Sequence, residues 1–90
     1  MTFNGATYRS AEVFIQLTDT ANTEYAAMKG VVVHNGTTAF ISLFGVTNTA
    51  GEGSDLATIT ATYNSGTIEI KALSTGGVTA AKVQYSLAAL

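Results

Sequence analysis

Hydrophobic and polar residues alternate along residues 9–18, RSAEVFIQLT. One side of this segment carries Ala11, Val13, Ile15 and Leu17, and the other side carries Glu12, Phe14, Gln16 and Thr18. A period of two residues is typical of a β-strand with one buried face. The following residues, 19–28, contain turn-forming Asp and Asn, and we expect them to form a connection rather than a strand.

An Asn-Gly pair between hydrophobic runs marks a hairpin in residues 31–45, VVVHNGTTAFISLFG. We expect Asn35 and Gly36 to form a two-residue type I′ turn, which would place Val31 opposite Phe40. Both faces of this hairpin are hydrophobic, and each carries four large apolar residues: Met28, Val32, Ile41 and Leu43 on one face, and Val31, Val33, Phe40 and Phe44 on the other. The core of a small sandwich covers only one face, so the second must be covered by another segment of the chain, such as residues 1–8, or by another subunit.

The C-terminal half of the chain fits a meander of three strands. A four-residue loop places Tyr63 opposite Ile68 and matches hydrophobic partners along both strands. A turn at residues 74–77 then places Glu69 opposite Lys82 on the outer side. Cross-strand pairs of opposite charge stabilise a sheet by about 0.2 to 1 kcal/mol, so this register is favourable.

About six strands joined by short loops indicate an all-β fold, a small antiparallel β-sandwich or jelly roll, with residues 1–90 as one domain. Charged residues make up 11% of the chain. Typical soluble domains contain about 25%, and this shortage favours a protein that works packed in an assembly, as a homo-oligomer or on a host surface.

The composition argues against several other classes of protein. The chain has no Cys, which excludes disulfides, thiolate nucleophiles and zinc-thiolate sites. Four Lys and Arg residues and a net charge of -2 provide no basic surface for nucleic acid. The apolar runs are too short to span a membrane, and the N-terminus lacks the features of a signal peptide, so we expect a soluble, unprocessed chain.

No combination of residues predicts catalysis, a metal site or a cofactor. His34 is the single imidazole, and a surface or turn-supporting role is favoured over a catalytic or metal-binding one. Nothing in the sequence brings two of the six carboxylates together, and residues 51–55, GEGSD, do not match a phosphate-binding loop. Sugar stacking is a weak alternative, carried by Tyr8, Tyr25, Tyr63 and Tyr85, of which Tyr63 and Tyr85 are expected to point inward.

A longer pattern of residues covers nearly the whole chain. It begins with an Arg-Ser-Ala strand opening, passes through a Gln-x-Thr segment and a Tyr, reaches a His-x-Gly-Thr-Thr turn and ends with Gly and Leu-Ala-Thr. In this sequence the pattern comprises Arg9, Ser10, Ala11, Gln16, Thr18, Tyr25, His34, Gly36, Thr37, Thr38, Gly53, Leu56, Ala57 and Thr58. It resembles a β-rich module in structural proteins of tailed bacteriophages, especially those that infect cyanobacteria. Asn35 replaces an Asp of that pattern, and SLFG replaces a more polar segment, which favours an interface at Phe44.

This resemblance implies a non-enzymatic protein on the surface of a virus particle. We expect the 90 residues to be the complete chain, without a coiled-coil stem, which favours a capsid decoration, or cement, subunit that binds neighbouring shell proteins. The alternative is a module of a tail fibre or appendage that binds host glycans. In the favoured case, we expect Val31, Val33, Phe40 and Phe44 to form the interface with capsid or other virion proteins.

Overall fold

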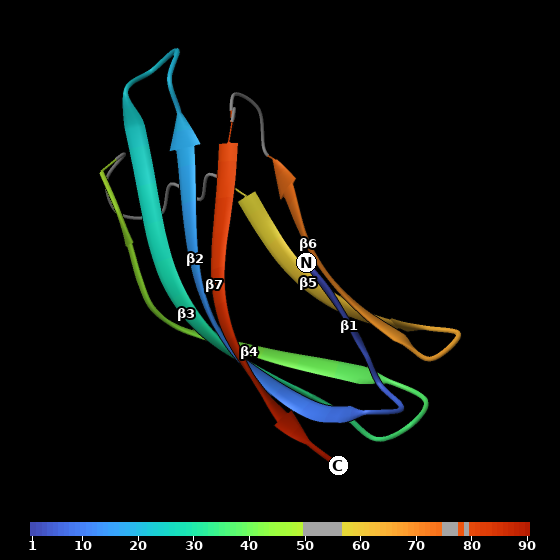
Figure 1. The fold of residues 1–90 in the computed structure, drawn as a ribbon. Helices are drawn as coiled ribbons and strands as arrows, with labels where there is room; N and C mark the ends of the chain where they lie inside the picture. Colours follow the sequence, from blue (N-terminus) through green and yellow to red (C-terminus); the bar gives the residue numbers. More distant parts are fainter. Residues whose placement is uncertain (50–56, 75–77, 79) are drawn as a thin grey trace.

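The computed structural model describes residues 1–49, 57–74, 78 and 80–90. The chain folds into a sandwich of two antiparallel β-sheets (Figure 1). The strands are β1 (Thr2–Asn4), β2 (Tyr8–Asp19), β3 (Glu24–His34), β4 (Ala39–Asn48), β5 (Ala57–Asn64), β6 (Thr67–Ser74) and β7 (Ala80–Ala89). The expected all-β architecture is confirmed, and the seventh strand is the short β1 at the N-terminus.

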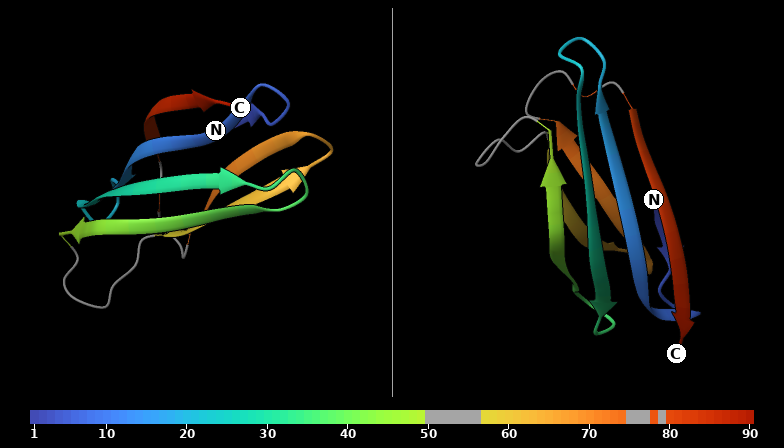
Figure 2. Two further views of the ribbon diagram at one scale, coloured as in Figure 1. Left: turned by 90° about the horizontal axis from the view of Figure 1, so that it is seen from below. Right: turned by 90° about the vertical axis from the view of Figure 1, so that its left-hand side faces the viewer.

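The two sheets differ in size and pack face to face. The smaller sheet has the strand order β1-β6-β5, and the larger sheet has the order β4-β3-β2-β7. Figure 2 shows the curved four-stranded sheet as one layer, with β4 and β7 as its outermost strands. No helix occurs within the described ranges, and therefore none there is long and apolar enough to cross a membrane.

β2 and β3 form the longest hairpin, and it begins earlier than the sequence suggested. The connection expected over residues 19–28 contains only a tight turn at residues 20–23, because β3 starts at Glu24. The carboxylate of Asp19 accepts hydrogen bonds from the backbone N–H and the side-chain amide of Asn22, at 3.2 and 2.9 Å. These bonds close the turn locally, so the polar residues that predicted a long connection stabilise a short one.

The hairpin of β3 and β4 has a longer turn than the predicted type I′ turn at Asn35 and Gly36. His34 pairs with Ala39 and Val33 with Phe40, so four residues separate the strands. Gly36 has a positive φ, whereas Asn35 does not and instead accepts bonds from the backbone N–H groups of Thr37 and Thr38. The register is displaced by two residues, which preserves the side-chain period and leaves the predicted faces unchanged.

The hairpin of β5 and β6 has the predicted register, including the pair Tyr63 with Ile68. The turn itself is tighter, since Asn64 pairs with Thr67 and only Ser65 and Gly66 lie between them. Ser65 has φ 50° and Gly66 has φ 88°. Positive φ at both central positions is the requirement of a type I′ turn, so this turn type occurs here rather than at the Asn-Gly pair.

The prediction that β7 pairs with β6 is wrong. β6 is flanked by β5 on one side and β1 on the other, whereas β7 crosses to the larger sheet and pairs with β2. Lys82 therefore lies opposite Gln16, and Glu69 forms an ion pair with Lys71 of its own strand at 2.9 Å. Of the turn expected at residues 74–77, residues 75–77 lie outside the described part of the chain.

The core lies between the two sheets and is formed by their inward side chains. The predicted inward residues of residues 9–18 are all buried, with Leu17 fully enclosed. The buried apolar residues are Phe3, Ala11, Val13, Ile15, Leu17, Ala26, Met28, Val32, Ala39, Ala57, Ile59, Ile68 and Ile70. Because both sheets bury only one face in this core, the opposite face of each sheet points away from it.

Candidate functional site

The outward face of the four-stranded sheet carries a cluster of exposed apolar side chains. Phe14 lies on β2, Val31 and Val33 lie on β3, and Phe40 and Phe44 lie on β4. Their exposed fractions range from 38% for Phe14 to 54% for Phe40. We call these five residues the outer apolar face. Isolated apolar residues are normal on protein surfaces, but a contiguous group marks an interaction surface.

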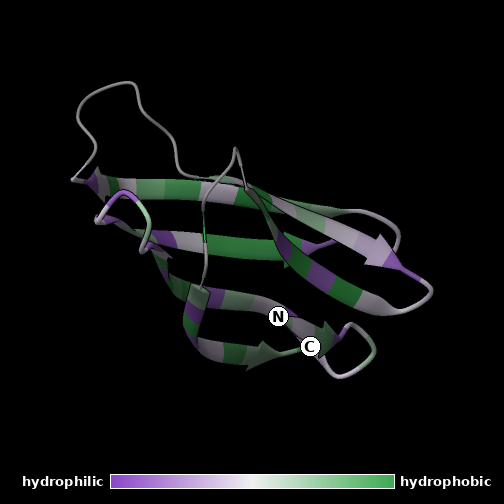
Figure 3. Ribbon diagram, turned by 90° about the horizontal axis from the view of Figure 1, so that it is seen from above, coloured by the Kyte–Doolittle hydropathy of each residue, from purple (hydrophilic) through white to green (hydrophobic). Residues whose placement is uncertain are grey.

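The strand register shows that these side chains are neighbours. Val33 lies opposite Phe40 across the ladder of β3 and β4. Phe44 and Phe14 lie on either side of Lys29, one on each adjacent strand. Val31 itself lies opposite Glu12 and Ser42, so its apolar neighbours on the adjacent strands are diagonal ones. Diagonal neighbours are about 7 to 8 Å apart, within reach of aromatic side chains, so Val31 connects Phe14, Phe40 and Phe44 into one group beside Lys29. In Figure 3, hydrophobic colour covers most of β4 and the part of β3 near its C-terminal end.

The N-terminal segment does not cover this face. β1 belongs to the smaller sheet, where Phe3 pairs with Ile68 and is 6% exposed. Tyr8 packs against the core rather than on the outer face. Of the two covers that the sequence allowed, residues 1–8 are therefore ruled out. Val31, Val33, Phe40 and Phe44 remain exposed to solvent within the described part of the chain.

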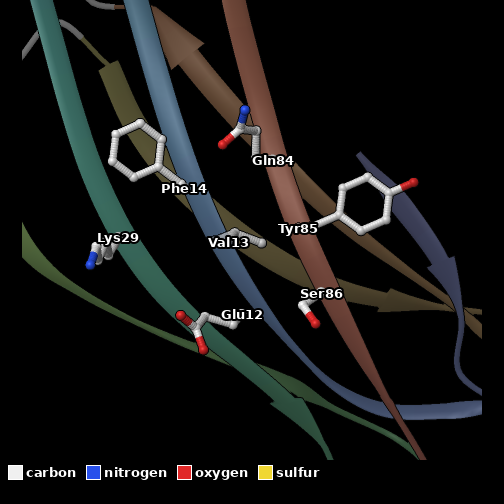
Figure 4. Close-up of a pocket in the computed structure, with 7 residues that line it drawn as sticks. All are labelled: Glu12, Val13, Phe14, Lys29, Gln84, Tyr85 and Ser86. Carbon is white, nitrogen blue, oxygen red and sulfur yellow. The ribbon is translucent and has the colours of Figure 1, made fainter.

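A shallow depression of about 430 Å³ lies beside the outer apolar face, between β2, β3 and β7 (Figure 4). Its rim includes Phe14, Lys29 and Gln84 from three adjacent strands, together with the Glu12 carboxylate. The polar side chains of Gln84 and Ser86 accompany this carboxylate and the Lys29 ammonium, so polar and apolar groups line the depression together.

His34 is buried, which corrects the surface position that the sequence allowed, whereas its turn-supporting role is confirmed. His34 is only 3% exposed. The backbone N–H of Gly36 donates to Nδ1 at 3.0 Å, so Nδ1 is unprotonated and Nε2 carries the hydrogen that is donated to the carbonyl oxygen of Tyr8 at 2.7 Å. The ring also contacts Tyr63, with centroids 5.6 Å apart. Both ring nitrogens are therefore engaged in holding the turn and β2 together.

The carboxylates in the described part of the chain do not converge on a site. Asp19 is buried and bonded to Asn22. Hydrogen bonds from Lys71 and then from Asn64, together with the charge of Lys71, lower the pKa of Glu69 below its ordinary value. Among the described residues, no three His, Asp or Glu side chains lie close enough to hold a metal ion. Residues 51–55 (GEGSD), with two of the six acids, and the Gly53 and Leu56 positions of the family pattern lie outside the described residues.

The four tyrosines do not form one stacking surface. Tyr8 and Tyr63 are partly buried against the core, as expected for Tyr63. Tyr85 is 57% exposed, contrary to the expectation that it points into a core, because β7 is an edge strand. It lies opposite the buried Val13, whereas Tyr25, 44% exposed, lies on the outer side of β3. The two exposed tyrosines thus lie on opposite sides of the sheet.

Sequence patterns missed one member of the outer apolar face. Phe14 was placed on the polar side of its strand, which is correct, but nothing local showed that β2 lies next to β3 with Phe14 opposite Lys29. The ladder of β2 and β3 is what brings Phe14 to the apolar residues of β3 and β4. A large apolar residue on the polar side of an alternating strand was the available signal.

Comparison with known proteins gave no match to a family model, a curated protein or a solved structure.

Proposed function

We propose that this chain is a non-enzymatic structural protein of a bacteriophage particle, a capsid decoration subunit that docks on neighbouring shell proteins through its outer apolar face. The observation that carries the proposal is the exposure of Val31, Val33, Phe40 and Phe44 on a single sheet face, with no segment of the described chain over it. The resemblance of the Arg-Ser-Ala and His-x-Gly-Thr-Thr pattern to phage structural modules supports the assignment to a virion.

The energetics of the outer apolar face favour docking. Covering a large apolar side chain that is about half exposed removes unfavourable contact with water at roughly 25 cal/mol per Å² of apolar surface. Few charged residues share the outward side of the four-stranded sheet with these apolar side chains. They are Glu12, Lys29 and Lys82. Few charges need to lose their hydration when a partner binds, which lowers the cost of association.

The state of His34 supports a non-enzymatic role. Its two ring nitrogens are occupied by hydrogen bonds to Gly36 and Tyr8. A general base needs a free nitrogen within reach of the proton that it removes from a substrate. The imidazole of this chain is instead part of the structure that fixes the turn before β4.

The experiment is co-sedimentation of the purified protein with undecorated shells assembled from the major capsid protein of the phage that encodes it. We expect saturable binding. Val31→Lys should abolish binding without unfolding the protein, because the new ammonium lies opposite Glu12 and forms a favourable cross-strand pair. A wild-type protein that stays in the supernatant would refute the decoration role.

The chain offers a matched control on the other sheet. Thr62 is exposed on β5 and lies opposite Glu69, so Thr62→Lys adds the same charge opposite the same kind of partner. We expect this variant to bind shells like the wild type. Equal loss of binding in both variants would show that net charge, rather than the outer apolar face, controls the association. Binding to isolated tail structures in place of shells would favour the appendage role.

A further inference from the structure

β4 forms an edge of the four-stranded sheet, and its second side is not paired with any described strand. Figure 2 shows it as the outermost strand on the side opposite β7. An edge strand presents a row of backbone N–H and C=O groups that can pair with another strand. Natural proteins usually block such edges with charges, proline or shortness, so the sequence of each edge shows whether pairing is prevented or allowed.

The β4 edge carries none of these blocking features. Its ten residues, AFISLFGVTN, contain no charge and no proline. Phe40, Leu43, Phe44 and Val46 along it are 37 to 54% exposed. The other edges differ: β7 carries Lys82, β1 has three residues, and β5 presents threonines on its outward side. Among the described edges, β4 is therefore the one that combines length, neutrality and apolar side chains.

The ladder with β3 determines which backbone groups of β4 face the open side. The backbone N–H of Asn35 donates to the carbonyl oxygen of Thr38 at 3.1 Å, so these two residues form a hydrogen-bonded pair. Hydrogen-bonded and non-hydrogen-bonded pairs alternate along an antiparallel ladder. Phe40 and Ser42 consequently direct their backbone groups to β3, whereas Ile41 and Leu43 direct theirs to the open edge.

We propose that β4 pairs antiparallel with β4 of a second copy of this chain, about a two-fold axis at Ser42. This register places Phe40 opposite Phe44 of the second copy, and Ile41 opposite Leu43 of the second copy. Aromatic residues meet aromatic residues on the outer side, and aliphatic residues meet aliphatic residues on the inner side. Ile41 and Leu43, whose backbone groups are open, become the hydrogen-bonded pair.

The side-chain chemistry agrees with this register. Phe40 and Phe44 form the non-hydrogen-bonded pairs, where side chains approach most closely, and cross-strand aromatic pairs stabilise a sheet. No charge is brought opposite a like charge, because β4 has none. The positive φ of Gly45, 63°, interrupts the extended strand directly after Phe44, which limits the pairing to residues 40–44 and fixes its centre at Ser42.

The two-fold axis runs perpendicular to the sheet, so both outer apolar faces lie on the same side of the resulting eight-stranded sheet. Val31, Val33 and Phe14 stay uncovered by this pairing because they lie on β3 and β2, inside the sheet. The inference does not require the shell-binding role. If that role holds, the dimer presents a docking surface twice as large as one chain can.

Ser42→Cys tests the register directly, since the chain has no other cysteine. Residues on the axis form a non-hydrogen-bonded pair with Cα atoms about 4.5 Å apart, within the range for a disulfide. Ser86→Cys is the matched control: the same substitution, also exposed and outward, on the opposite edge strand. Under oxidised glutathione, Ser42→Cys should form a disulfide-linked dimer at least about tenfold faster than Ser86→Cys. The dimer holds its two introduced thiols together at an effective concentration on the order of millimolar, whereas the thiols of the control meet only by diffusion.

Leu43→Pro provides the second test. Its N–H faces the open edge, so proline there removes an intermolecular bond without breaking the ladder with β3. By sedimentation equilibrium, the wild type and Leu43→Ala should have about twice the 9.3 kDa chain mass, and Leu43→Pro should have the mass of one chain with an unchanged β spectrum. A monomeric wild type at its highest soluble concentration, or equal disulfide formation by the two cysteine variants, would overturn the proposal. Loss of shell binding by Val31→Lys with the dimer retained would separate the two proposals.

Discussion

Replacing His34 with alanine tests how much the buried imidazole stabilises the fold. The substitution removes the bonds to Tyr8 and Gly36 and the ring contact with Tyr63. Each neutral hydrogen bond has a net value of about 1 kcal/mol, and an aromatic contact adds about 0.5 to 1.5 kcal/mol. We therefore expect His34→Ala to lower the free energy of unfolding by about 3 kcal/mol. In a domain of this size the midpoint of thermal unfolding then falls by roughly 12 to 24 °C.

The assay is urea unfolding followed by far-ultraviolet circular dichroism, because the chain has no tryptophan for fluorescence. His34→Asn is the informative companion: its amide oxygen can accept from Gly36 in place of Nδ1, so about half of the loss should be recovered. Thr38→Ala in the same loop is the control, since Thr38 is exposed and it is its backbone N–H, which the substitution keeps, that bonds to Asn35, so we expect a change within about 0.5 kcal/mol. A loss below about 1 kcal/mol for His34→Ala would refute the argument, because it would mean that neither bond contributes to stability.

Two further predictions concern the packing and the charge of the sheets. Gly30→Ala should destabilise the protein by about 1 to 2 kcal/mol in the same urea assay, since overpacking of a core typically outweighs the entropic gain. The added Cβ would lie 3.1 Å from Val13 Cγ2 and from Leu43 Cδ2, and an increase in stability would contradict this packing. Lys71→Ala should raise the pKa of Glu69 toward its ordinary value, as measured by NMR titration of the carboxyl group, because the ammonium holds that pKa down in the native protein. Because the pKa of Glu69 is lower in the folded than in the unfolded protein, the ionised carboxylate stabilises the fold at pH values above the unfolded pKa, and this contribution is lost as pH falls through the folded pKa. An unchanged Glu69 titration in Lys71→Ala would show that the Glu69–Lys71 pair is absent in solution.

Local pairing was predictable from residue patterns where a strand and its hairpin partner are adjacent in sequence. The β5 and β6 register follows from matching Tyr63 with Ile68, and it is confirmed. The faces of β3 and β4 are also correct, although their turn is two residues longer, because a shift of two leaves each side chain on the same face. The position of β7 was not predictable in this way. Its alternation fits β6 and β2 equally well, and only the three-dimensional packing selects β2.

His34 and the outer apolar face show the same limit in the candidate site. A histidine before a turn is normally solvated, and the sequence has no signal that Tyr8, far away along the chain, places a carbonyl oxygen beside it. The exposed apolar residues of β3 and β4 were identified from the doubly hydrophobic hairpin, whereas the participation of Phe14 depends on how β2 is placed beside β3.

The sequence by itself determined the all-β class, the alternation of residues 9–18 and the excess of apolar surface on the hairpin in residues 31–45, because these depend on side-chain period and composition. Only the tertiary structure decided which strands are neighbours, that the N-terminal segment enters the core, and that β4 is an open edge. The physical reason is that strand pairing between distant segments is chosen by the total burial of both sheets, a quantity that no local pattern contains.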